Sequence, residues 1–287
     1  MSSPDHRQST RAAASLTGDV TGAGVFRVVL DGYDAVYDAL PRGETFNRLW
    51  RANAYAGDFP GEFAHIGFLT LAEAQRMREL LQARPEDILA DLACGTGGPG
   101  LWMAQHCGAS LIGADPSAAG LSAARARARA AGLADRSRFL QGTFEQTNLP
   151  GGAVDATMSV DAFQYAPGKR AALAEFFRIL RPGGRVAIIA FEVDPVKVAG
   201  VPVLGADPVP DYVPLLEAAG FGVEAYEETP GWRERVNAAF NAVVDASDTL
   251  TAEMGEAAAA AVVAEAMLTV QIQPYPRRVL VVARRPD

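Results

Sequence analysis

The sequence predicts an α/β fold: a doubly wound, mostly parallel, seven-stranded sheet with helices on both faces. Three observations predict it. Seven short apolar runs alternate with helical patterns along residues 85–287, as in folds built from strand–helix–strand units. A glycine-rich turn at residues 95–100 joins the first of these runs to a helix. Pro182, Gly183 and Gly184 stop a helix directly before the fifth run, because such residues interrupt helices.

The individual elements can be placed along the chain from their start and stop signals. Thr70 and Glu73 have the spacing of a capping box, which opens a helix that Pro85 ends near residue 83. Gly132 stands where it would close a helix over residues 117–131. Strands are expected at 88–93, 110–115, 138–141, 155–160, 185–191, 223–228 and 278–284, and further helices at 101–107, 169–180, before Gly220, at 232–246 and at 252–268.

Four segments with different roles are expected. Residues 1–22 are rich in Ser, Thr, Ala and charge and read as a flexible tail. Residues 23–84 carry aromatic residues at mixed spacings, which predicts irregular helices forming an N-terminal cap. Residues 85–287 form the sheet domain, and the long stretch at about 229–276 is expected to be a helical lid inserted before the last strand.

Composition excludes several classes of protein. The 287 residues include 26 Lys and Arg against 34 Asp and Glu, a net charge of −8, whereas nucleic-acid binding needs a basic face. Two cysteines and three scattered histidines argue against a disulfide framework and a metal site. The apolar runs are too short for a membrane span, and the N-terminus lacks a signal core. A cytoplasmic protein is expected, with a homodimer left open.

The glycine-rich turn indicates a ligand with a nucleotide part. Gly95, Gly97 and Gly100 satisfy G-x-G-x-x-G, and Asp115 closes the next strand, where a carboxylate can accept hydrogen bonds from ribose hydroxyls. Taken literally, this pattern predicts a nicotinamide-dependent oxidoreductase. Asp91, four residues before the first glycine, argues against that reading, because an anion repels a pyrophosphate but favours a cationic ligand.

Three blocks in order and spacing give the sequence a family resemblance. They are residues 91–97 (DLACGTG), 113–117 (GADPS) and 179–184 (ILRPGG). The chain resembles the class I S-adenosylmethionine-dependent methyltransferases, which have a Rossmann-like sheet. The segment from His65 to Phe68 is similar to the H-x-G-Y/F element of the small-molecule members, which include natural-product, ubiquinone and tocopherol methyltransferases.

The resemblance implies S-adenosylmethionine as cofactor and assigns its contacts residue by residue. Asp91, Ala93, Gly95 and Gly97 would hold its amino-acid end, Asp115 its ribose, Pro116, Thr143 and Phe144 its adenine, and Ser159 and Phe68 would close the site near the reactive end. Many relatives carry Asp where this chain has Thr143, and a threonine hydroxyl accepts a hydrogen bond without bringing a charge.

The catalytic residues follow less directly. Glu192, Tyr165 and His65 are the candidates, with Asp161 beside them at the end of the fourth strand. Relatives that methylate hydroxyls often carry His near positions 164 and 165, where this chain has Gln164 and Tyr165. The expected acceptor is a small metabolite methylated on oxygen or nitrogen, with carbon left open. The alternatives are a methyltransferase fold with a non-methylating role, and the oxidoreductase.

Overall fold

The computed structural model describes residues 22–55, 57–199 and 207–287. The predicted tail, residues 1–22, therefore lies outside the described residues except for Gly22, which begins the first helix. In the part of the chain that is described, no helix combines the length and the apolar character that crossing a membrane requires.

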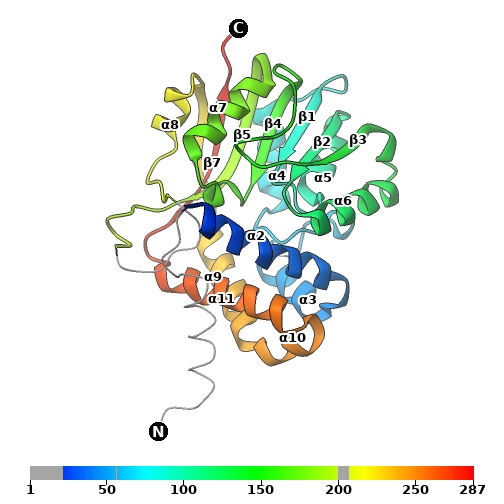
Figure 1. The fold of residues 1–287 in the computed structure, drawn as a ribbon, viewed down its shortest axis with the longest axis vertical. Helices are drawn as coiled ribbons and strands as arrows, with labels where there is room; N and C mark the ends of the chain where they lie inside the picture. The colour runs from blue at the N-terminus through cyan, green and yellow to red at the C-terminus, as the bar shows by residue number, and fades with distance from the viewer. Residues whose placement is uncertain (1–21, 56, 200–206) are drawn as a thin grey trace.

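The centre of the protein is a seven-stranded sheet in the order β3-β2-β1-β4-β5-β7-β6 (Figure 1). Its strands are β1 (Ile88–Leu92), β2 (Ser110–Asp115), β3 (Ser137–Gln141), β4 (Val154–Val160), β5 (Leu180–Glu192), β6 (Gly222–Glu228) and β7 (Arg277–Arg284). β7 runs antiparallel to both β5 and β6, and the pairs among β1 to β5 are parallel. The predicted fold class is confirmed. β5 starts at Leu180 rather than at residue 185, since Leu180 pairs with Val154 across a register irregularity.

Helices cover both faces of the sheet. α4 (Leu71–Leu81), α5 (Gly98–Cys107) and α6 (Ala118–Ala130) share one apolar core with alternate strand residues such as Leu89 and Met158. α7 (Lys169–Ile179) and α8 (Val213–Ala218) share the other core with the intervening residues, such as Ala90 and Ile188. The strands are apolar on both faces because parallel strands are buried on both.

A layer of helices lies across one end of the sheet (Figure 1). It consists of α2 (Gly22–Ala39), α3 (Glu44–Asn53), α9 (Trp232–Asp245), α10 (Ser247–Met254) and α11 (Glu256–Ile272). α11 packs on α2 and α9, and α3 packs on α9 and α10. The N-terminal cap and the lid, which are far apart in sequence, therefore form one helical layer.

Three expectations about these helices are corrected. α2 is a regular helix of 18 residues rather than an irregular segment. α4 falls inside the predicted cap but packs on β5, β7 and α5, so the cap ends before residue 70. The predicted helix at 252–268 is two helices, because Gly255 adopts φ 87° between α10 and α11, a conformation that favours glycine.

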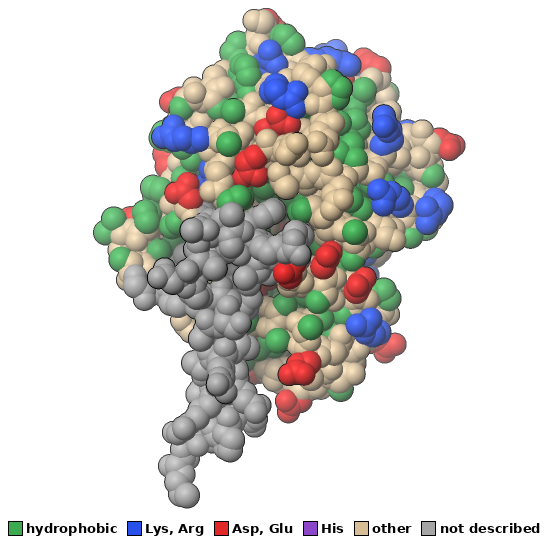
Figure 2. Space-filling view, viewed as in Figure 1, with side chains coloured by type: hydrophobic (Ala, Val, Ile, Leu, Met, Phe, Trp, Pro, Cys, Tyr) green, Lys and Arg blue, Asp and Glu red, His purple; other side chains and the backbone are tan. Residues whose placement is uncertain are grey.

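The strand order fixes where a ligand can bind. The chain passes from β1 outward to β2 and β3, then returns to place β4 on the other side of β1. At such a switch point the connections leave in opposite directions and open a crevice beyond the carboxyl ends of the strands. The helical layer covers the open side of this crevice (Figure 1). On the face of the described residues drawn in Figure 2, basic and acidic side chains are interspersed without an extended basic patch.

Candidate active site

A cavity of about 1550 Å³, including its open mouth, lies between the carboxyl ends of the strands and the helical layer. Its walls come from the glycine-rich turn, the carboxyl ends of β2, β4 and β5, the segments at 65–68 and 142–144, Pro276, and helices α2, α9 and α11. The predicted site residues that line it are Phe68, Asp91, Ala93, Gly95, Asp115, Pro116, Thr143, Phe144, His65 and Tyr165. The fold therefore brings ten of the predicted site residues together around one cavity.

Two buried carboxylates flank the glycine-rich turn. Asp91 accepts a hydrogen bond from the backbone N–H of Gly100, and burial together with the charge of Asp115 raises the pKa of Asp91 to about 7. Asp115 accepts from the backbone N–H groups of Gly95 at 2.7 Å and Ser117 at 2.8 Å. Burial raises the pKa of Asp115 to about 6, although these two hydrogen bonds act to lower it. Such a pair suits a ligand that brings positive charge or hydroxyl donors.

The turn itself depends on glycine at two positions. Gly95 has φ 50°, and a Cβ atom there would lie 2.5 Å from the Tyr37 hydroxyl oxygen. Gly97 has φ 79° and precedes α5, where a Cβ would meet the Cβ of Ala124 at 3.0 Å. Gly97 is absent from the cavity wall. Its observed role is to shape the turn, and its predicted contact with the cofactor stays a prediction.

The predicted adenine residues form a mostly apolar corner. Pro116, Thr143 and Phe144 all line the cavity. The Thr143 hydroxyl accepts the backbone N–H of Gln146 at 3.2 Å, which fixes its orientation. Phe144 packs edge-on against Phe163 with ring centroids 5.5 Å apart. A flat apolar group fits this corner.

His65 forms part of the cavity wall. Its Nδ1 accepts the backbone N–H of Gly67 at 3.1 Å, so the ring proton of the neutral form is on Nε2. The imidazole packs against the rings of Tyr55 and Phe59, at centroid distances of 4.8 and 4.7 Å. Burial lowers the pKa of His65 to about 4. The ring is therefore a neutral wall residue, held in place by its own loop.

Asp161 ties this loop to the sheet. It directly follows β4, has φ 53° and accepts the backbone N–H of Phe68 at 2.7 Å. The fully buried guanidinium of Arg278 donates to both oxygens of Asp161, at 2.7 and 3.0 Å, and to Glu73 at 3.0 Å. This network anchors the segment at 65–68 over the cavity.

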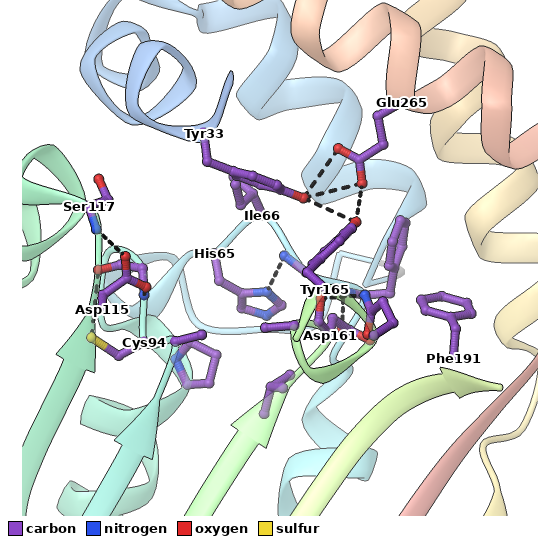
Figure 3. A pocket seen from close by; sticks show the side chains of 18 of the residues that line it. Tyr33, His65, Ile66, Cys94, Asp115, Ser117, Asp161, Tyr165, Phe191 and Glu265 are labelled. Carbon is purple, nitrogen blue, oxygen red and sulfur yellow. Dashed lines mark hydrogen bonds between the residues drawn. The ribbon is translucent and has the colours of Figure 1, made fainter. Parts of the chain in front are cut away.

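A second polar cluster lies where α2 and α11 approach the end of β4 (Figure 3). The Tyr165 hydroxyl donates to Glu265 at 2.8 Å, and the Tyr33 hydroxyl is 3.2 Å from both Glu265 oxygens. The two hydroxyl oxygens are 3.4 Å apart. Burial raises the pKa of the Glu265 carboxyl and of both phenols.

Two of the predicted site residues, Glu192 and Ser159, do not line the cavity. Glu192 is 2% exposed and is absent from the cavity wall. It accepts hydrogen bonds from the Tyr212 backbone N–H at 3.0 Å and from the Tyr226 hydroxyl. Because side chains alternate along a strand, Phe191 faces the cavity and Glu192 the opposite side of β5. Ser159 is likewise buried outside the wall, while its neighbour Val160 lines it. Neither residue is retained as a site residue.

The wall residues that sequence reasoning missed include Tyr33, Tyr37 and Glu265. Tyr33 and Tyr37 are four residues apart and so share a face of α2, which was a usable signal. Glu265 is a single acid within the apolar stretch of α11, and it too was visible as an exception. Their convergence on β4 was not visible, because it depends on how the helical layer docks.

Comparison with known proteins places this geometry in a family. The sequence profile of the methyltransferase domain family matches residues 89–184, the stretch that carries the glycine-rich turn and Asp115. Residues 89–184 of the chain therefore form a methyltransferase domain. The family resemblance of the three sequence blocks is thus confirmed, and the family decides against the nicotinamide reading of the glycine pattern.

Individual methyltransferases resemble the chain over different lengths. The 27-O-demethylrifamycin SV methyltransferase of Amycolatopsis mediterranei is 27% identical over 70% of this chain and 78% of its own. The 24-methylenesterol C-methyltransferase 2 of rice (Oryza sativa subsp. japonica) is 35% identical over 40% of this chain. The chain thereby spans only about a third (32%) of the length of the rice protein.

Solved structures with this methyltransferase fold are more distant in sequence. The [4+2]-cyclase SpnF superposes with a TM-score of 0.65 and 22% identity, covering 74% of this chain and 79% of its own. The geranyl diphosphate C-methyltransferase of Streptomyces coelicolor A3(2) superposes with a TM-score of 0.56 and 19% identity, covering 75% and 78%. At these identities the similarity concerns the fold.

Proposed function

We propose that the protein transfers a methyl group from S-adenosylmethionine to a small, largely apolar metabolite. The observation that carries the proposal is the pair Asp91 and Asp115, two buried carboxylates that flank the glycine-rich turn and line the cavity. A sulfonium cofactor brings positive charge and ribose hydroxyls, which match two carboxylates better than a pyrophosphate does. The family relatives with small-molecule names support the same acceptor class.

Some of the cavity residues would bind the cofactor and others the acceptor. Asp91, Ala93 and Gly95 would hold the amino-acid end of the cofactor, Asp115 the ribose, and Pro116, Thr143 and Phe144 the adenine. The bound cofactor supplies an activated methyl group. The chain supplies alignment and exclusion of water, and such positioning is worth about 7–11 kcal/mol. Phe68, Phe191 and Phe240 form the apolar wall that would hold the acceptor.

Of the predicted catalytic residues, Tyr165 keeps a place beside the acceptor. Its hydroxyl lies in the cavity wall and is bonded to Glu265. His65 acts as a wall and not as a base, since Nδ1 is occupied by the Gly67 N–H. Oxygen and nitrogen are the preferred acceptor atoms, and carbon is the alternative.

Calorimetric titration with S-adenosylhomocysteine, NADH and NADPH tests the proposal. Wild type is expected to bind S-adenosylhomocysteine alone, and Asp115→Ala to weaken that binding at least tenfold. The matched control is Asp135→Ala, an exposed site, which should leave the affinity unchanged. Binding of a nicotinamide cofactor instead would refute the proposal. A non-methylating role would show as cofactor binding without formation of S-adenosylhomocysteine when acceptors are screened.

Two expectations about the whole molecule stay predictions. One is a cytoplasmic location and the other is a homodimer. Light scattering coupled to size-exclusion chromatography decides the second, since a dimer has twice the chain mass of 30.3 kDa.

A further inference from the structure

Glu265 is an acid in an unusual position. It lies in the second half of α11, whose residues from Ala257 to Leu268 are otherwise Ala, Val, Met and Leu. Its carboxylate faces the cavity and receives hydrogen bonds from two tyrosines on separate elements, Tyr33 of α2 and Tyr165 of the short helix η4 (Phe163–Tyr165). Two distant parts of the chain, α2 and η4, thus meet the carboxylate of α11 (Figure 3).

This carboxylate has no cationic partner within the described residues. The groups that act on it are burial and the two phenols. No Lys or Arg lines the described part of the cavity, His65 is neutral, and the guanidinium of Arg278 is taken up by Asp161 and Glu73. A carboxylate among apolar and aromatic groups is costly unless a positive charge compensates it.

The side chain of Gln164 adds a second hydrogen-bond acceptor to the cavity wall. The side-chain amide nitrogen of Gln164 donates to the backbone oxygen of Asp161 at 2.7 Å. Its Oε1 is buried, unpartnered among the described residues and part of the same cavity wall. The ring of Tyr33 lies 5.8 Å from that of Tyr37 and 6.0 Å from that of Tyr165, and aromatic faces attract cations.

We propose that Glu265, Tyr33 and Tyr165 bind a protonated amine of the acceptor, whose apolar body packs against Phe191, Phe240 and Ile272. This inference rests on the proposed methyltransferase function and narrows its substrate class to apolar amines. Acceptors that carry a phosphate or carboxylate near this position are excluded by the same charge. The amine acts as donor to the carboxylate and to the Gln164 oxygen.

Three probes with one apolar body and different charges test the site: 1-adamantylamine, 1-adamantanol and adamantane-1-carboxylate. Each is titrated calorimetrically into the full chain at pH 7.5 with saturating S-adenosylhomocysteine. We expect the amine to bind at least tenfold more tightly than the alcohol, and the carboxylate not to bind. Glu265→Gln should reduce the preference for the amine to less than twofold. Glu256→Gln, at an exposed position of the same helix, should retain it.

Several outcomes overturn the proposal. These are equal or tighter binding of the alcohol, binding of the carboxylate, a preference for the amine that survives in Glu265→Gln, or no binding of any probe. Sinefungin, which has an amine in place of the sulfonium methyl group, identifies the remaining alternative. If Glu265→Gln weakens sinefungin but not S-adenosylhomocysteine, Glu265 serves the methyl donor and the proposal is wrong.

The two proposals can fail separately. If S-adenosylhomocysteine does not bind the wild-type protein, the proposed function is refuted. In that case the amine titration is repeated in the absence of S-adenosylhomocysteine, and it tests the amine site alone. Binding of S-adenosylhomocysteine together with loss of amine preference refutes only the amine site.

Discussion

Arg278 and Asp161 form a two-point ion pair buried beneath the cavity, with donor–acceptor distances of 2.7 and 3.0 Å. The pair joins the second residue of β7 to the residue after β4, and β5 lies between these two strands in the sheet. Since Asp161 also accepts the Phe68 N–H, the ion pair holds a wall of the cavity as well as the sheet. Its loss should therefore affect both stability and binding.

Arg278→Met should destabilise the fold by about 3–5 kcal/mol, because removal of one partner leaves a buried charge uncompensated. Here Asp161 loses its cationic partner, whereas Glu73 keeps its ion pair with Arg235 at 2.7 Å. Urea unfolding measures the change. The control is Arg185→Met at the surface pair with Glu224, for which less than about 1 kcal/mol is expected. Similar losses in the two variants would contradict the role given to the buried pair.

Asp91 should make the stability of the ligand-free protein depend on pH. Its pKa is raised from an ordinary value of 3.8 to about 7, so the folded state favours the protonated acid. The stabilisation is complete below about pH 4 and is lost as the pH rises through 7. Between pH 5.5 and 8 this group alone should cost about 2 kcal/mol of unfolding free energy.

Asp91→Asn removes this titration while keeping an acceptor for the Gly100 N–H. Urea unfolding at pH 5.5 and pH 8 should then show a smaller difference than in wild type, by about 2 kcal/mol. The exposed Asp135→Asn serves as the control. A wild-type difference that persists in Asp91→Asn would assign the pH dependence to other groups.

Gly95→Ala should weaken the binding of S-adenosylhomocysteine by more than the strain of the backbone conformation alone explains. The added Cβ would lie 2.5 Å from the Tyr37 hydroxyl oxygen, whereas Gly132, with φ 69°, has no atom within 4 Å of such a Cβ. Both substitutions strain a left-handed residue by roughly 1–2 kcal/mol. Gly132→Ala should therefore retain the affinity for S-adenosylhomocysteine, and Gly95→Ala should lose at least tenfold. Equal affinities would show that Tyr37 moves away freely.

Features set by local chemistry could be predicted from the sequence. The capping box of α4 forms as expected, with Thr70 and Glu73 bonded reciprocally, because capping needs only residues three apart. The seven strands and the glycine-rich turn also follow from apolar runs and from φ values that only glycine tolerates well. Asp91 is the penultimate residue of β1 and Asp115 the last of β2. They reach the same cavity because the carboxyl ends of parallel strands meet at one edge.

Features set by packing could not be predicted. Glu192 was expected in the cavity because it ends β5, but a difference of one residue along a strand reverses the side that a side chain faces. Glu265 reaches Tyr165 across 100 positions in the sequence, and no periodic pattern encodes that contact. The union of cap and lid into one layer depends in the same way on how α11 packs on α2.

His65 should remain neutral over the physiological range of pH. Burial lowers its pKa from an ordinary 6.5 to about 4, so the folded state favours the neutral ring. Its contribution to stability is present above about pH 6.5 and is lost as the pH falls toward 4, by up to roughly 3 kcal/mol. Nuclear magnetic resonance of the imidazole Cε1–H, assigned by comparison with His65→Gln, measures the midpoint directly.

The midpoint of His65 should lie near 4 in the native protein and near 6.5 in concentrated urea, where the ring is hydrated. Because Nδ1 is occupied by the Gly67 N–H, a ring that titrates so low has little capacity to take a proton from an acceptor. His65→Gln should then lower turnover less than the roughly 10²–10⁴-fold that loss of a general base costs. A native midpoint near 6.5, together with a loss in that range, would restore His65 as a catalytic base.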